Sequence, residues 1–143
     1  MKKYLLVTAV ILSSMVFYSD ASAQCDAMKH KGACVGQLAD GFTFIKSYLL
    51  DGAKSNGKGE IEYSFVFSKG TTYMLTFANN VGKSDNVEIT LLDPEGKELA
   101  KNMHGGKYYP IGYACKTTGV HYMKFKFKGT DDHCGLSVLG FKR

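Results

Sequence analysis

The amino-acid sequence predicts an all-β protein: an antiparallel, jelly-roll-like β-sandwich of about eight strands with a short N-terminal helical segment. From residue 42 onward, apolar and polar residues alternate with a period of two, which is typical of strands with one buried face. Turn-forming residues separate these runs at intervals of about 8–12 residues, as in sandwiches and barrels. Strands do not alternate with helical patterns, which excludes a parallel α/β sheet.

The first 23 residues have the pattern of a secretory signal peptide. Lys2 and Lys3 provide a positive start, and residues 4–17 form an apolar run. This run is shorter than the roughly 20 residues of a transmembrane helix. Residues 21–23 (ASA) form a small-residue cleavage site. We therefore expect removal of residues 1–23 and a periplasmic or extracellular protein without a transmembrane segment.

Residues 24–41 are predicted to form an N-terminal segment that disulfides pin to the sandwich domain of residues 42–143. Within it, residues 25–40 are expected to form one helix, with Asp26 as its N-cap. Gly32 and Gly36 weaken this prediction, because each costs about 1 kcal/mol relative to alanine inside a helix.

The strands expected in the sandwich cover residues 42–50, 61–67, 73–77, 87–91, 97–100, 108–115, 120–128 and 136–141. Pro110 favours an edge position or a bulge for its strand, because proline cannot donate to a sheet ladder. Gly96, in the turn Asp-Pro-Glu-Gly, and Gly119 are both expected to adopt a positive φ. In the strand of residues 120–128, the alternation directs Met123, Phe125 and Phe127 to the core and the intervening lysines to solvent.

All four cysteines follow the expected signal peptide: Cys25, Cys34, Cys115 and Cys134. An even number in an exported domain predicts two disulfides. If residues 108–115, 120–128 and 133–141 are successive antiparallel strands, Cys115 and Cys134 lie about 23 Å apart, too far to bond. On one helix, Cys25 and Cys34 lie about 13 Å apart, which is again too far. Each N-terminal cysteine should therefore pair with one sandwich cysteine, and both such pairings remain open.

A metal site is not expected, because no Cys-x₂₋₄-Cys pair occurs. Lipidation of Cys25 is a less favoured alternative to simple cleavage, since Gln24 is a poor residue before a lipidated cysteine. Asp85, Asp131 and Asp132 are loop carboxylates for which we favour turn formation over calcium binding.

Two groups of side chains are candidates for ligand contact. Lys124, Lys126 and Lys128 form a cationic row that would suit an acidic polysaccharide or an anionic outer-membrane surface, and we favour a solvated face or a charged edge strand as the simpler explanation. Tyr108 and Tyr109 are candidates for an aromatic platform for sugars, and burial of these rings is the alternative.

The sequence contains no G-x-S-x-G or H-E-x-x-H motif and no nucleic-acid-binding motif. The formal net charge of +5 is modest and does not require an anionic partner. We therefore expect a protein that is not an enzyme, needs no cofactor and does not bind nucleic acid.

Three stretches resemble the bacterial pre-peptidase C-terminal domain, and the eukaryotic GOLD domain has a similar sandwich pattern. They are residues 60–77 (EIEYSFVFSKGTTYMLTF), 87–102 (VEITLLDPEGKELAKN) and 117–127 (TTGVHYMKFKF). The resemblance implies a β-sandwich that accompanies secreted enzymes and assists secretion or binding to substrates and surfaces. No catalytic domain is recognisable in these 143 residues, and four cysteines are not typical of that family.

The function expected from these observations is that of a non-catalytic, exported binding or accessory module of the bacterial cell envelope. Its ligand would be a glycan or another secreted protein. The alternative is a structural or assembly component of an envelope or secretion complex.

Overall fold

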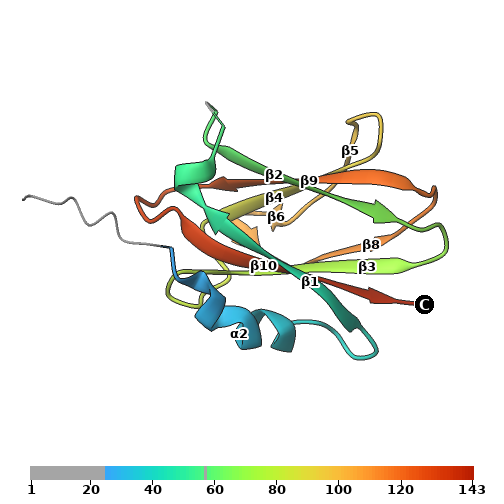
Figure 1. Ribbon diagram of the computed structural model, residues 1–143, viewed down its shortest axis with the longest axis horizontal. Helices are drawn as coiled ribbons and strands as arrows, with labels where there is room; N and C mark the ends of the chain where they lie inside the picture. Colours follow the sequence, from blue (N-terminus) through green and yellow to red (C-terminus); the bar gives the residue numbers. More distant parts are fainter. Residues whose placement is uncertain (1–24, 57) are drawn as a thin grey trace, which may run out of the picture.

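A computed structural model describes residues 25–56 and 58–143 as two four-stranded antiparallel sheets packed against each other (Figure 1). Sheet A has the strand order β1 (Thr43–Asp51), β10 (Cys134–Lys142), β3 (Thr72–Asn79), β8 (Ile111–Ala114). Sheet B has the order β2 (Glu60–Phe67), β9 (Gly119–Phe127), β4 (Val87–Leu92), β5 (Glu98–Lys101). A small hairpin pairs β6 (Met103–His104) with β7 (Lys107–Tyr108). The predicted all-β antiparallel sandwich is confirmed.

The main core lies between the two sheets and is built from alternate residues of each strand. In β4, Val87, Ile89 and Leu91 are completely buried. In β9, Met123 and Phe125 are completely buried, and Phe127 packs against the core while partly exposed. The predicted inward-facing residues of β9 are therefore confirmed.

A second apolar cluster lies between the outer face of sheet A and the N-terminal segment. This segment contains η1 (Ala27–His30) and α2 (Lys31–Gly36), which lie below β10 in Figure 1. The buried members of the cluster are Ala27, Cys34, Ala78, Cys134, Leu136 and Val138. Sheet A thus buries apolar side chains on both faces, whereas sheet B does so mainly on one.

The prediction of a single helix over residues 25–40 was wrong. The segment begins with a 3₁₀ turn, and the α-helix ends at Gly36. Asp26 makes no side-chain capping hydrogen bond. Both glycines that weakened the prediction lie in α2, Gly32 near its start and Gly36 as its last residue.

The sequential order of the last strands differs from the expected one. β8 lies in sheet A, β9 in sheet B and β10 again in sheet A, so these strands are not successive neighbours. The strand expected over residues 108–115 is divided instead: β7 ends at Tyr108, Pro110 lies between the two strands, and β8 begins at Ile111. β8 is an edge strand of sheet A, the position that the proline favoured. At one flank of the sandwich β1 lies beside β2, and at the other β5 lies beside β8.

Gly96 and Gly119 serve different purposes. Gly96 has a φ of +82°, which confirms the predicted turn, and the Asp93 carboxylate accepts hydrogen bonds from the amides of Glu95 and Lys97 there. Gly119 does not have a positive φ, so the prediction for it was wrong. It begins β9, and a Cβ atom added to it would lie 2.8 Å from Cγ of Pro94. Close approach of two chain segments explains this glycine.

Alanine at either glycine is expected to lower the free energy of unfolding by more than about 1 kcal/mol, for these two separate reasons. Urea unfolding of Gly96→Ala and Gly119→Ala measures this. In a Pro94→Ala background the cost of Gly119→Ala should shrink, because the close contact has been removed. An equal cost in both backgrounds would show that Pro94 does not constrain Gly119.

Candidate functional site

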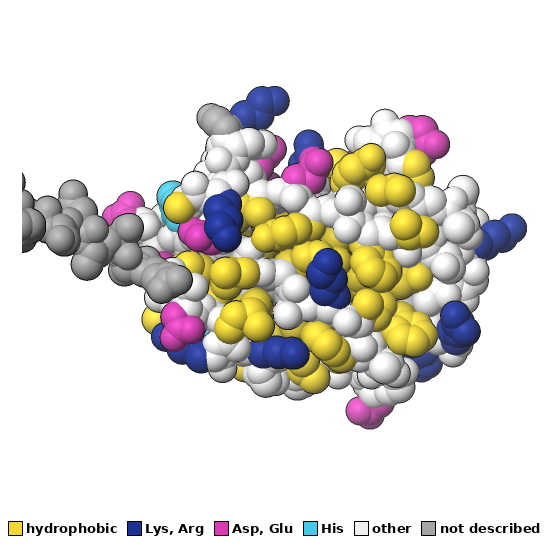
Figure 2. All heavy atoms as spheres, viewed as in Figure 1, with side chains coloured by type: hydrophobic (Ala, Val, Ile, Leu, Met, Phe, Trp, Pro, Cys, Tyr) yellow, Lys and Arg dark blue, Asp and Glu magenta, His cyan; other side chains and the backbone are white. Residues whose placement is uncertain are grey.

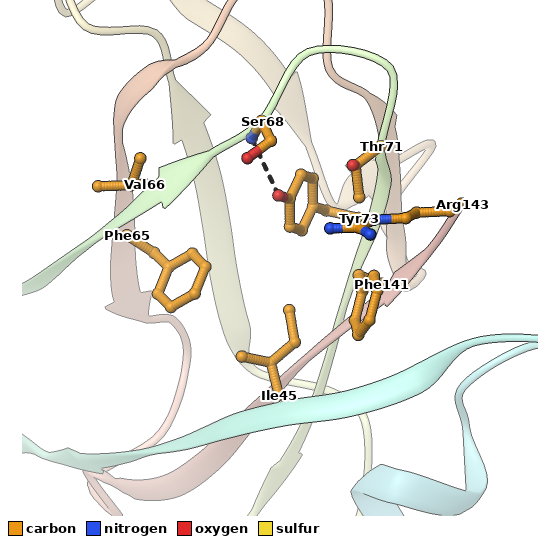
Figure 3. A pocket seen from close by; sticks show the side chains of 8 residues that line it. All are labelled: Ile45, Phe65, Val66, Ser68, Thr71, Tyr73, Phe141 and Arg143. Carbon is orange, nitrogen blue, oxygen red and sulfur yellow. Dashed lines mark hydrogen bonds between the residues drawn. The ribbon is translucent and has the colours of Figure 1, made fainter.

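A groove of about 320 Å³ opens between the two sheets at the flank formed by β1 and β2 (Figure 3). Its lining comes from both sheets and consists of Ile45, Phe65, Val66, Ser68, Thr71, Tyr73, Phe141 and Arg143. Figure 2 shows hydrophobic side chains gathered across the face of the molecule between β2 and β1. This volume is at the small end of the range for ligand sites, about 300–1,000 Å³.

A bulge in β1 places Ile45 in the groove. The register of β1 against β10 shifts between Phe44 and Lys46, so Ile45 is the extra residue. Phe44 packs into the outer cluster, whereas Ile45 packs against the main core and Lys46 is exposed. A bulge commonly redirects a side chain in this way. The consecutive apolar pair Phe44-Ile45 interrupts the alternation and is the sequence signal for it.

Aromatic rings form the walls of the groove. Tyr73 is 5 % exposed and stacks on Phe67 with ring centroids 3.9 Å apart. The Tyr73 hydroxyl accepts a hydrogen bond from the Ser68 amide at 3.0 Å (Figure 3). In the same view, the side chains of Phe65, Ile45 and Phe141 surround an open space. Stacking and the hydrogen bond hold the Tyr73 wall in place before any ligand arrives.

The mouth of the groove carries a positive charge. The Arg143 guanidinium lies 6.0 Å from the centroid of the Phe141 ring. Among the described residues no carboxylate forms an ion pair with Arg143, and no acidic side chain lines the groove. The groove therefore combines an apolar interior with one available cation. Sequence reasoning missed it, because its residues come from three separate stretches of chain, at positions 45, 65–73 and 141–143.

Farther along the same flank, two tyrosines join β1 and β2. The rings of Tyr48 and Tyr63 lie 4.9 Å apart, and the Tyr63 hydroxyl donates to the Leu49 carbonyl at 2.6 Å. The buried Tyr48 hydroxyl has no hydrogen-bond partner within the described part of the chain. Burial, with a contribution from Tyr63, raises the pKa of Tyr48 to about 12. Both observations indicate a neutral, structural role for Tyr48.

The predicted cationic row lies on the outer face of β9, the second strand of sheet B rather than an edge. Lys124 lies 3.7 Å from the Glu62 carboxylate, and Lys128 lies 3.8 Å from that of Glu88. Lys126 is opposite Glu60 on β2 and Glu88 on β4 in the strand register. An anionic ligand would compete with these carboxylates for the lysines.

Tyr108 and Tyr109 do not form a shared platform. Tyr108 packs against the core, with its ring centroid 6.3 Å from that of Phe77. Tyr109 is 48 % exposed, and its amide donates to the Asn102 carbonyl. One exposed ring remains available at this position.

The cysteines form one disulfide where the sequence predicted two. Cys25 and Cys134 are bonded, with their Cα atoms 5.4 Å apart, and Cys34 and Cys115 are free and buried. Cys34 lies in the outer cluster and Cys115 in the core between the sheets, so sheet A separates the two thiols. Burial raises the pKa of the Cys34 thiol to about 11, which keeps it protonated and unreactive.

The disulfide pins the N-terminal segment to the sandwich, as predicted. A disulfide is compatible with an oxidising, exported compartment. The expected signal peptide lies outside the described residues. Within the described ranges, no helix is long and apolar enough to cross a membrane, and no group of three or more His, Cys, Asp or Glu side chains is arranged to hold a metal ion.

The fold and the groove define a class: a small antiparallel β-sandwich with an apolar groove at one flank. No family model, curated protein or solved structure matches the chain. The resemblance to the pre-peptidase C-terminal domain therefore stays a prediction based on sequence motifs.

Proposed function

We propose that this protein is a non-catalytic, exported binding module of the cell envelope, and that its ligand binds in the groove between β1 and β2. The observation that supports this most is the combination of an open aromatic groove with the unpaired Arg143 at its mouth. Of the two ligand classes expected from the sequence, the apolar lining favours a secreted protein over a glycan. Sugars present many hydroxyl groups, and few side chains here would pair with them.

The lining defines the chemistry that a ligand needs. Burial of apolar area in the groove contributes about 25 cal/mol per Å². The Arg143 guanidinium offers a planar set of donors that matches a carboxylate or another oxyanion. A ligand with an apolar group and a nearby anion therefore fits both features.

The fluorescent probe 1-anilinonaphthalene-8-sulfonate combines an apolar ring system with one anion and tests this site. We expect saturable binding to the folded protein, weakened about fivefold by Arg143→Gln, which removes the charge-assisted contact worth about 1 kcal/mol at an exposed site. Ile45→Trp should abolish binding by filling the groove. Fluorescence titration gives the dissociation constants.

Val81→Trp is the matched control, because Val81 is 68 % exposed and follows the end of β3 away from the groove. It should bind the probe as the wild type does. Thermal unfolding of each variant confirms that it is folded. Binding that neither Arg143→Gln nor Ile45→Trp alters, or the absence of saturable binding, would contradict a ligand site in this groove.

A further inference from the structure

We propose that the ligand is an extended segment of another exported protein, which adds as a strand to the free edge of β2 over residues 64–67. Its inward-facing apolar side chain enters the groove, and a carboxylate of the same segment lies beside Arg143. This inference rests on the proposed function and specifies the partner of the same site.

The free part of the β2 edge is confined to its second half. β2 pairs only with β9 among the described strands. At its start, the Asn56 amide donates to the Glu60 carbonyl at 2.8 Å, and the Asn56 side chain accepts from the Glu60 amide at 3.1 Å. Within the described ranges, the backbone of residues 62–67 forms no hydrogen bond beyond the β9 ladder. Such an edge offers unpaired donors and acceptors to another chain.

The neighbouring edge of β1 is blocked. The bulge at Ile45 interrupts its ladder, and the exposed Lys46 follows directly. Farther along, the Leu49 carbonyl already accepts the hydrogen bond from the Tyr63 hydroxyl. Bulges and charged residues are features that prevent edge-to-edge pairing. An added strand therefore pairs with β2.

The opposite flank, formed by β5 and β8, is less suited to strand addition. β5 and β8 have four residues each. Where the pairing of β5 with β4 ends, the buried Asn102 side chain accepts from the Ile89 amide at 2.7 Å and donates to the Val87 carbonyl at 2.8 Å. The Asn102 side chain thus satisfies backbone groups of β4 that a further strand would otherwise bind. Within the described part of the chain, the β2 flank combines a free strand edge with the apolar groove.

The free edge and the groove coincide. Phe65 and Val66 line the groove and belong to the free stretch of β2, and Val66 is 56 % exposed. Side chains of an added strand alternate in direction, so every second one faces the space between the sheets. Backbone pairing then provides affinity, and the groove selects the side chain, as in other cases of strand addition.

Charge favours a different protein over a second copy of this chain. Each groove mouth carries the Arg143 guanidinium, and no acidic side chain is among its lining residues. Symmetric pairing of two β2 edges would bring two such mouths together and place like charges near each other. A partner segment with an acidic residue supplies the missing opposite charge.

Short synthetic peptides of the form acetyl-Thr-Val-Thr-Z-Thr-Asp-amide, with Z as Val, Ile, Leu, Met, Phe or Tyr, are the probes, because Z and the aspartate then lie on the same face of the added strand. We expect at least one to bind and to slow hydrogen exchange of the Ser64 and Val66 amides by about tenfold or more, measured by NMR. These two amides point to the free edge, because they alternate with Glu60, whose backbone pairs with Asn56 on that side, whereas those of Phe65 and Phe67 point to β9. A version with alternate backbone nitrogens methylated on its pairing edge should lose binding, because the ladder cannot form. Arg143→Gln should weaken binding of the aspartate peptide about fivefold and leave the asparagine version unchanged.

The outcomes separate this inference from the proposed function. If the fluorescent probe binds in the groove but no peptide protects the Ser64 and Val66 amides, or if the methylated peptide binds equally well, strand addition is wrong and the groove remains a ligand site. If sedimentation shows a dimer in which the Ser64 and Val66 amides are protected without peptide, a second copy is the occupant and the inference is overturned. If neither probe binds, both proposals fail.

Discussion

Replacement of both disulfide cysteines, Cys25→Ala with Cys134→Ala, is expected to lower the free energy of unfolding by about 4–5 kcal/mol. The bond joins residues 109 positions apart, and closing so long a loop removes much of the entropy of the unfolded chain. It also holds η1 and α2 over the outer cluster of sheet A. Total stabilities are typically about 5–15 kcal/mol, so the variant should be marginal. Urea unfolding under non-reducing conditions measures the loss.

The matched control removes the two free thiols, by Cys34→Ala with Cys115→Ala, and should cost about 1 kcal/mol for each change. Non-reducing peptide mapping should give one linked pair, Cys25–Cys134, with the other two cysteines alkylated only after denaturation. A Cys34–Cys115 linkage would contradict the separation of these two thiols by sheet A. Equal losses in the two double variants would show that the Cys25–Cys134 bond does not stabilise the fold in this way.

Phe125→Ala should lower the free energy of unfolding by about 3–5 kcal/mol, the usual cost of removing a buried phenylalanine ring. Phe125 is completely buried and lies opposite Ile61 on β2 and Ile89 on β4. Its ring also meets the edge of Tyr63 at a centroid distance of 6.2 Å. Chemical unfolding measures this free energy. If the alanine variant does not fold, Phe125→Leu, for which a smaller loss is expected, takes its place in the comparison with the control.

The neighbouring Lys126→Ala is the control, because its side chain is on the outer face of β9 among partly exposed charges. Its expected effect is below about 0.5 kcal/mol. Similar losses for Phe125→Ala and Lys126→Ala would contradict the register of β9, since a strand with a period of two cannot bury both residues on one side.

The period of two in the sequence correctly predicted which residues of β2, β4 and β9 face the core. This succeeded because burial of one sheet face determines that pattern directly. The partners of each strand were not predictable in the same way. Alternation contains no information on whether β8, β9 and β10 belong to one sheet or cross between two.

The disulfide prediction failed in part for the same reason. The strand-length argument correctly excluded a Cys115–Cys134 disulfide. It did so although β8, β9 and β10, which it assumed to be neighbours in one sheet, are not. Cys34 and Cys115 lie on opposite faces of sheet A, which only the tertiary structure reveals. The groove could not be predicted from the sequence either, because it depends on the bulge at Ile45 and on how β2, β3 and β10 pack together across the two sheets.

The position of β10 between β1 and β3 has a consequence for the order of folding. Residues 43–51 pair with residues 134–142, so β1 has no neighbour in sheet A until almost the whole described chain is present. Contacts between such distant residues slow folding, because a large loop must close before any of them contributes. When the chain becomes available from its N-terminus, β1 and β3 are therefore complete before β10, the strand that joins them. A chain shortened by β10 would lose the centre of sheet A and Cys134 together, and could not complete this half of the sandwich.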